Sequence, residues 1–199
     1  MLRMTTPGRA DVPGAFRDAL RAIGSTRLRP EVVLREIPAP RRIAPFAVAL
    51  EASVHRGGHD ADDEVASGRF IVLHDPAGQE AWDGTFRVVT LVRTVMEPDM
   101  AADPLLAEVA WTWLEDALDG VDAHATGGTI TRVVSESFGA LAGRDADVEL
   151  EARTSWTPGS PDLGPHLSAW ATFLCAAAGL PPLPDGVSAF RPRRETMGS

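Results

Sequence analysis

Alternation of apolar and polar residues along the chain predicts five β-strands. The clearest cover residues 46–55 and 145–156, where every second residue is apolar and the residues between are mostly polar or small. Residues 85–96 are apolar on both faces, which indicates a strand at the centre of a sheet. A short run at 69–74 and a longer one at 127–139 complete the set. Gly, Asp and Pro turn signals separate most of these strands, so hairpin connections and an antiparallel sheet are expected.

Longer segments place apolar residues at helical spacing instead. Residues 11–24 do so up to a glycine stop. Residues 103–120 start with an Asp-Pro pair that is typical of a helix N-terminus. Residues 165–178 are apolar almost all round, which indicates a buried helix. A short further helix is expected over residues 30–37.

The main elements follow one another in the order α-β-β-β-α-β-β-α. This order predicts an α+β fold in which helices pack on a single antiparallel sheet of about five strands. We expect one domain over residues 1–185, with a helical N-terminal arm over about residues 1–45. An extended or disordered tail is expected over residues 186–199, which follow a proline-rich stretch.

The fourth expected strand does not reveal which of its faces is buried. One face carries Thr, Ser and Val side chains, whereas the other carries Ile130, Val134 and Phe138 together with Arg132 and Glu136. The two charged residues are about 13 Å apart along a strand, too far to pair, so burying both would cost several kcal/mol. We therefore expect the Thr/Ser face to be buried and the mixed face to meet a partner, a dimer mate or the N-terminal helices.

The helix at 103–120 adds a second candidate surface. Val109 and Trp113 lie on its apolar stripe, where packing in the core is the more common role, while Trp111 lies to one side near Leu118. An exposed Trp beside leucine side chains is typical of a contact surface. The candidate partner-binding residues on the strand and the helix are Trp111, Leu118, Ile130, Arg132, Val134 and Phe138.

Charge and composition narrow the classes of partner. The chain of 199 residues has a formal net charge of −9, and all 19 of its basic residues are Arg. The negative charge disfavours nucleic-acid phosphate and anionic membrane surfaces, and no apolar run is long enough to span a membrane. The absence of Lys excludes a Walker A phosphate site and Schiff-base chemistry. The single Cys175 cannot form an internal disulfide, and a cytoplasmic location is expected.

The connection between the second and third expected strands is an alternative ligand site. It holds a histidine, an indole and three carboxylates, namely His74, Asp75, Glu80, Trp82 and Asp83. A His near carboxylates can bind a metal or transfer protons. No second His stands at ligand spacing, however, and Asp-Pro-Ala-Gly is typical of a turn. We therefore expect no catalytic residue, metal or cofactor, and lean against an enzyme.

Four stretches carry a family resemblance: PAPRRIAPFAVALEA (38–52), HDPAGQEAWDGTFRVVTLV (74–92), DMAADPLLAEVAWTWLEDAL (99–118) and SWTPGSPDLGPHLSAWATFLCAAAGLPP (155–182). Over about residues 10–185 the chain resembles an uncharacterised actinobacterial family of proteins of unknown function. That resemblance implies no catalytic residue, cofactor or substrate. The element order also resembles that of type III secretion chaperones, which are dimerising binders of other proteins.

Two functions from different classes follow from these observations. The first is a cytoplasmic protein-interaction or adaptor module, chaperone-like, that binds an unknown protein or a second copy of itself as a homodimer. The alternative is a small-ligand binder or enzyme that uses the loop at 74–84. The first is preferred because the strand with Arg132 and Glu136 offers a half-apolar surface that a protein can cover.

Overall fold

The computed structural model describes residues 12–56, 64–96, 103–142 and 147–180. The helices in these ranges are α1 (Gly14–Ser25), α3 (Leu106–Leu118) and α4 (Gly164–Ala177). The strands are β1 (Val32–Ile37), β2 (Phe46–His55), β3 (Glu64–Gln79), β4 (Gly84–Met96), β5 (Ala123–Ser135) and β6 (Asp147–Pro158). Two short 3-10 turns, η2 (Glu80–Trp82) and η3 (Gly139–Leu141), lie in the connections after β3 and β5. The expected tail at 186–199 lies outside the described residues.

One sheet contains all six described strands, in the order β1-β2-β3-β4-β6-β5. Every neighbouring pair is antiparallel. The α+β prediction with a single antiparallel sheet is therefore confirmed, with one strand more than expected. β1 and β5 form the two edges of the sheet.

The additional strand lies where a second N-terminal helix was expected, and that expectation was wrong. Val32, Val33 and Ile37 are β-branched, which favours an extended backbone, and each pairs with a residue of β2. Val32 is buried on the helix side, while Arg35 is exposed on the other side opposite Glu51. A short apolar run fits either element by periodicity, and here pairing with β2 determines the outcome.

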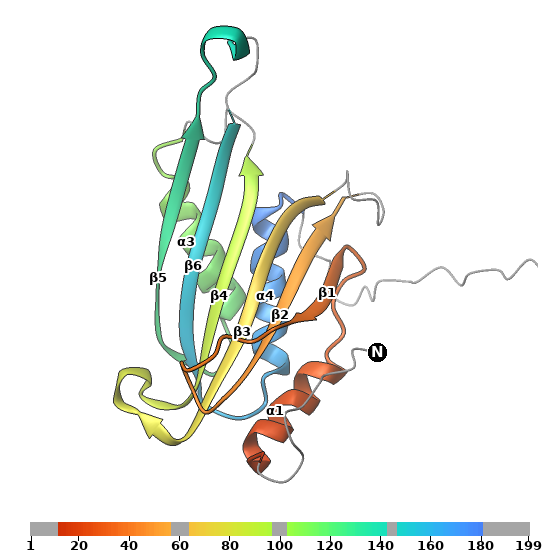
Figure 1. Ribbon diagram of the computed structural model, residues 1–199, viewed down its shortest axis with the longest axis vertical. Coiled ribbons are helices and arrows are strands. Elements are labelled where there is room, and N and C mark those ends of the chain that lie inside the picture. Colours follow the sequence, from red (N-terminus) through yellow and green to blue (C-terminus); the bar gives the residue numbers. More distant parts are fainter. Residues whose placement is uncertain (1–11, 57–63, 97–102, 143–146, 181–199) are drawn as a thin grey trace, which may run out of the picture.

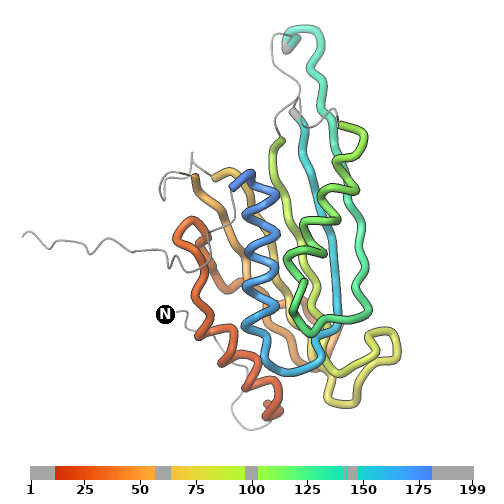
Figure 2. The backbone as a smooth tube through the Cα atoms, turned by 180° about the vertical axis from the view of Figure 1, so that it is seen from behind, coloured from red at the N-terminus to blue at the C-terminus, as the bar shows by residue number. Residues whose placement is uncertain are grey.

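The three helices all lie on one face of the sheet, as Figures 1 and 2 show from opposite sides. α4 packs across β3 and β4, α3 packs beside it toward β5, and α1 packs on its other side toward β1. We call the opposite side of the sheet the open face, because no described helix lies on it. The connector of residues 38–45 crosses the lower part of the open face in Figure 1 before β2 begins.

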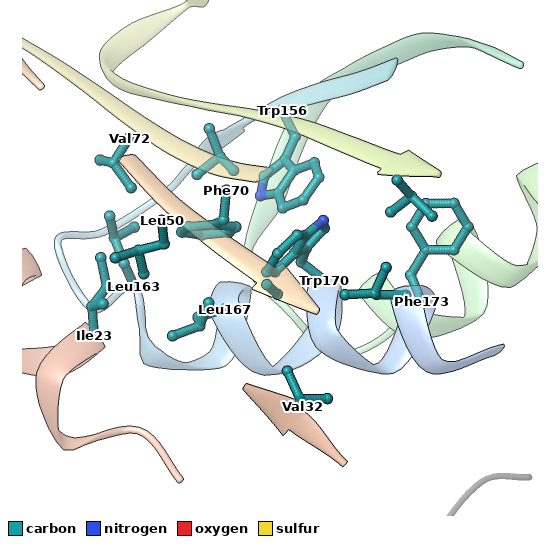
Figure 3. Packing of buried hydrophobic residues seen from close by; sticks show 14 of the residues in the cluster. Ile23, Val32, Leu50, Phe70, Val72, Trp156, Leu163, Leu167, Trp170 and Phe173 are labelled. Atoms are coloured by element: carbon teal, nitrogen blue, oxygen red, sulfur yellow. The ribbon is translucent and has the colours of Figure 1, made fainter. Parts of the chain in front are cut away.

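The main core fills the space between α4 and the centre of the sheet. Trp170 from α4 packs against Phe70, with ring centroids 5.5 Å apart, and Trp156 from β6 lies above them (Figure 3). Gly68 lets the helix approach closely, because a Cβ there would lie 2.8 Å from the Trp170 ring. As its pattern predicts, α4 is buried along most of its length. A smaller core cluster, formed by Met96, Leu106, Ala110, Val148 and Leu150, lies between α3 and the upper end of the sheet.

The prediction that the Thr/Ser face of β5 is buried was wrong. Ile130 pairs with Ala152, which is fully buried on the helix side, whereas Thr131 pairs with Glu151 on the open face. The reason is that β5 is an edge strand, so its helix-side residues need not enter the dry core. Ile130 is half-buried against the core clusters, while Arg132 and Glu136 both remain exposed. No charge is therefore desolvated by this arrangement, and the cost that motivated the prediction does not arise.

Candidate functional site

The outer edge of β5 is the longest exposed backbone edge of the sheet. β5 has 13 residues, and its inner edge pairs with β6 as far as Ser135. Within the described part of the chain no strand pairs with its outer edge. Residues 131–136 are all exposed. Such an edge presents unpaired N–H and C=O groups that can accept a further strand.

Exposed apolar side chains gather at the end of the sheet where β5 finishes. We call this group the apolar end, and it consists of Val95, Leu105, Val109, Val133, Val134 and Phe138. Among the described residues Ile43 is the one other large hydrophobic side chain that is exposed. Phe138 is 76% exposed and Val134 is 54% exposed. The segment after β5 projects beyond the rest of the sheet (Figure 1), so these side chains are accessible to another molecule.

The strand register places the members of the apolar end near one another. Val133 and Val95 both lie opposite Glu149 of β6, on the open face. Val134 lies opposite Val148, which belongs to the small core cluster under the start of α3. The apolar end therefore wraps from one face of the sheet to the other around the end of β5.

α3 turns one flank toward β5 and the other toward the main core. Trp113 and Ile130 both pack on the small core cluster, and Val109 lies one turn before Trp113 on the same flank. Trp111 lies on the opposite flank, packs against the main core, and donates from Nε1 to Glu115 Oε1 at 2.8 Å. Leu118 is half-buried against the same core. Val109 is thus more exposed than its place on the predicted stripe suggested.

The structure consequently brings together four of the six residues predicted to bind a partner. Ile130, Arg132, Val134 and Phe138 share β5 and its continuation, whereas Trp111 and Leu118 lie on the far flank of α3. Sequence reasoning missed Val95, Leu105, Val109 and Val133. The adjacent pair Val133–Val134 was the available signal, because two successive valines put apolar bulk on both faces of one strand.

The charges at the edge are opposite in sign and separated along the strand. Arg132 donates from Nη1 to the backbone carbonyl of Asp103 at 3.3 Å, which ties β5 to the start of α3. Glu136 is exposed one residue beyond the end of the β5 ladder. The two residues are four positions apart in the chain, about 13 Å along an extended backbone, so they do not pair with each other within one chain.

Charges on the open face, by contrast, form ion pairs with one another. Glu51 pairs with Arg35 and with Arg69, at 3.6 Å for the latter. Glu151 pairs with Arg93 and with Arg153, both at 2.6 Å. The guanidinium groups lower the pKa of Glu51 and, against a raising effect of burial, that of Glu151. The carboxylates of Glu51 and Glu151 on the open face are therefore already neutralised by arginines of the same chain.

The residues of the alternative site do not converge. His74 is 2% exposed and faces the helices, where its ring stacks on Phe86 and Phe16 and its Nδ1 lies 2.9 Å from the carbonyl of Thr85. Asp75, the next residue in β3, points to the other face of the sheet. Its carboxylate accepts from the backbone N–H of Ala77 at 3.0 Å, as in a turn. Burial lowers the pKa of His74, so the ring is a neutral core residue near neutral pH.

The remaining members of that loop are also separated. Glu80 is exposed, and Trp82 is buried. Asp83 has a left-handed backbone with φ of 56°, and its carbonyl lies 3.0 Å from Nε2 of His124. In the ranges that the structure describes, no three His, Cys, Asp or Glu side chains are placed to hold a metal ion. The loop is a hairpin in which His74 and Asp75 each contact a backbone group of the hairpin itself.

A shallow groove of about 470 Å³ lies between α1 and the connection from β6 to α4, lined by Asp18, Arg21, Ala22, Ser25, Ser160, Pro161 and Asp162. Its charged groups are exposed, and Arg21 pairs with Asp18 at 3.0 Å. No helix in the described ranges is long and apolar enough to cross a membrane.

Comparison with known proteins identifies a family but no activity. The model of a family described as "Protein of unknown function (DUF3000)" matches residues 12–188. No curated protein and no solved structure matches the chain. The predicted likeness to an uncharacterised family is confirmed in that respect, while the likeness in element order to type III secretion chaperones stays a prediction.

Proposed function

The chain belongs to the DUF3000 family of proteins of unknown function, and we propose that it is a protein-binding module. In this proposal the β5 edge pairs with a strand of another polypeptide. The observation that supports this proposal is the 13-residue exposed edge beside the apolar end. Addition of a strand to an exposed sheet edge is a common mode of peptide recognition, in which backbone hydrogen bonds give affinity and side chains give specificity.

The edge is a better candidate than the open face for a physical reason. A partner on the open face would meet carboxylates and guanidinium groups that already neutralise one another, such as Glu151 with Arg93 and Arg153. A partner at β5 would instead satisfy backbone groups and cover Val134 and Phe138, which are apolar and exposed. Covering apolar surface contributes about 25 cal/mol per Å² before the costs of association.

The proposal concerns a polypeptide partner rather than nucleic acid. A net charge of −9 opposes binding to phosphate backbones. The cytoplasm is the proposed compartment, and a single buried cysteine suits it: burial raises the pKa of Cys175 to about 11, so the thiol is unreactive. Nothing in the placement of His74 favours the alternative of a small-ligand site or an enzyme.

The proposal can be tested with a phage library of random peptides selected on the immobilised protein. We expect selected peptides to slow backbone amide exchange in residues 128–136. Thr131→Lys, which puts a cation on the exposed edge, should abolish this protection. Thr172→Lys makes the same change at an exposed position of α4, away from β5, and is the matched control. If peptides slow amide exchange in β5 equally in Thr131→Lys and in the control variant, or slow it in another region, β5 is not the binding edge.

A further inference from the structure

The sequence around the end of β5 is self-complementary when it is read in opposite directions from Val134. Residues 130–138 are ITRVVSESF. Ile130 and Phe138, both apolar, lie four residues before and four after Val134. Arg132 and Glu136, which carry opposite charges, lie two residues before and two after it. The hydroxyl residues Thr131 and Ser137 match in the same way. Only Val133 and Ser135 differ in polarity.

This inference rests on the proposed function and specifies the partner: we propose that β5 pairs with β5 of a second copy of the chain, antiparallel and centred on Val134. In that pairing Arg132 of each copy stands directly opposite Glu136 of the other, so two ion pairs form by symmetry. Directly opposed side chains on one face have Cβ atoms about 4.5–5.5 Å apart. Arg132 and Glu136, which are too far apart to pair within one strand, can thus pair between copies.

Other centres of pairing give worse matches. A centre at Arg132 or at Glu136 sets that charge opposite itself, which is destabilising. A centre at Val133 sets Arg132 opposite Val134, and a centre at Ser135 sets Arg132 opposite Phe138. Since a one-residue shift exchanges partners along the whole strand, the pattern selects one register.

The structure leaves this segment accessible. The β6 ladder ends at Ser135, so residues 136–138 pair with no strand in the described ranges. Phe138 has an extended backbone, with φ of −127° and ψ of 167°, so it can continue the strand direction. The Arg132 guanidinium has five N–H donors, so it can keep the Asp103 carbonyl and accept Glu136 of the second copy as an additional partner.

The same symmetry buries the helix side of the apolar end. Residues on one face of β5 meet residues on the same face of the second copy, so the two-fold axis is perpendicular to the sheet. Both α3 helices then lie on the same side of the joined sheet, with the flanks that carry Leu105 and Val109 toward the axis. These side chains and Val134 are exposed in the single chain, and a second copy would shield them. The two sheets would join into one continuous sheet.

Charge exchange tests the pairing directly on the full-length protein. We expect the wild-type chain to dimerise in sedimentation equilibrium over a concentration series. Glu136→Arg sets an arginine opposite Arg132 twice per dimer and should raise the dimer Kd by at least about ten-fold. Arg132→Glu should do the same, and the double variant Arg132→Glu/Glu136→Arg should return the Kd to within about three-fold of wild type. Glu80→Arg makes the same charge change in the exposed hairpin after β3, at the opposite end of the sheet, and should leave the Kd unchanged.

The outcomes separate this inference from the proposed function. A wild-type chain that stays monomeric, or a dimer that Glu136→Arg does not weaken, overturns the self-pairing; so does a double variant that fails to recover while circular dichroism shows it folded. If the chain is monomeric and selected peptides still protect β5 from amide exchange, the strand-binding function stands with another partner. If neither peptides nor rising protein concentration protects β5, both fall. Glu136 lies beyond the β5 ladder and is exposed, so Glu136→Arg tests the pairing without disturbing the fold.

Discussion

The two edges of the sheet are built in opposite ways. β1 has six residues and is followed by Pro38 and Pro40, which cannot donate to a ladder. It also carries Arg35, which is paired with Glu51 of β2. β5 has 13 residues, contains no proline and is exposed along most of its length. Short strands, prolines and charges are the usual devices against unwanted strand pairing. The β1 edge is therefore protected against strand pairing, and the β5 edge is left available.

The two halves of the sheet also differ in how their aromatic side chains are buried. In the half of the sheet that β1 bounds, Phe16 of α1 is fully buried against Phe46 of β2 and His74 of β3, with ring centroids 5.8 Å from each. Next to β5, the buried side chains are those of the small core cluster, and Val134 and Phe138 lie outside it. We therefore expect substitutions in the core between α1 and the sheet to alter folding and substitutions at the end of β5 to alter association.

A Phe→Ala substitution can be made both in the core, at Phe16, and at the end of β5, at Phe138. Phe16 is 1% exposed, so Phe16→Ala should lower the free energy of unfolding by about 3–5 kcal/mol. Phe138→Ala should change it by less than about 0.5 kcal/mol, because the ring is exposed, but should weaken the dimer. Urea unfolding at low protein concentration measures the first effect and sedimentation the second. Equal destabilisation by both variants would contradict the division between the edges.

Acid offers a second way to separate folding from edge pairing. Burial lowers the pKa of His166 to about 4, below its ordinary value of 6.5, although Asp122 and Asp162 oppose the shift. Trp156 donates from Nε1 to Nδ1 of His166 at 3.1 Å, a bond that needs this nitrogen unprotonated. The unfolded chain therefore binds the proton first as pH falls. The contribution of neutral His166 to the free energy of unfolding is fully present above pH 6.5. It should decline between pH 6.5 and about 4, by up to about 1.4 kcal/mol per pH unit.

The pairing of Arg132 with Glu136 involves no histidine, so the dimer Kd of the folded protein should stay constant over the upper part of that pH range. Urea unfolding at a series of pH values, with His166→Gln as the non-titrating variant, measures the folding effect. The variant should show a shallower loss of stability with acid, and His74, whose pKa burial also lowers, accounts for part of the remaining slope. An unchanged slope would show that His166 does not link folding to pH.

The sequence predicted the sheet better than it predicted the edges of the sheet. In strands β2 and β6 every second residue is apolar because one face of each strand is buried, and this periodicity is visible in the local sequence. β1 was mistaken for a helix because its short apolar run acquires its identity from pairing with β2. The buried face of β5 was mistaken because the cost of burying Arg132 and Glu136 applies only inside a sheet, and no local signal shows that a strand lies at an edge.

The residues of the candidate site could be predicted only where they share one strand. Ile130, Arg132, Val134 and Phe138 were found because they share one strand, so their spacing is visible in the sequence. Val95 and Val109 could not be found, because they reach the apolar end through the register of β4 and the packing of α3. The convergence of His74 with its neighbours was not realised because β3 continues to Gln79 and sends alternate residues to opposite faces.

Alanine substitutions at two glycines compare how closely the centre of the sheet and the β5 edge are packed. A Cβ at Gly68 would lie 2.5 Å from the Leu91 carbonyl and 2.8 Å from the Trp170 ring, so Gly68→Ala should destabilise the fold by about 1–3 kcal/mol. A Cβ at Gly127 would meet nothing within 4 Å, so Gly127→Ala should be neutral or stabilise by up to about 1 kcal/mol. Thermal unfolding of the two variants measures both effects. A large loss of stability in Gly127→Ala would show that β5 is more closely packed than its open edge indicates.

The smallest expected effect comes from removing the cation on the protected edge. Arg35 is exposed and pairs with Glu51, which Arg69 also contacts, so Arg35→Thr should lower the free energy of unfolding by about 0.2–1 kcal/mol. The variant makes the β1 edge resemble β5 in charge, yet six residues followed by prolines remain. If strand length and proline are what protect β1, sedimentation should show no new species beyond the dimer. Higher oligomers in Arg35→Thr would mean that the charge alone keeps this edge unpaired, and that the two edges differ by one side chain rather than by their architecture.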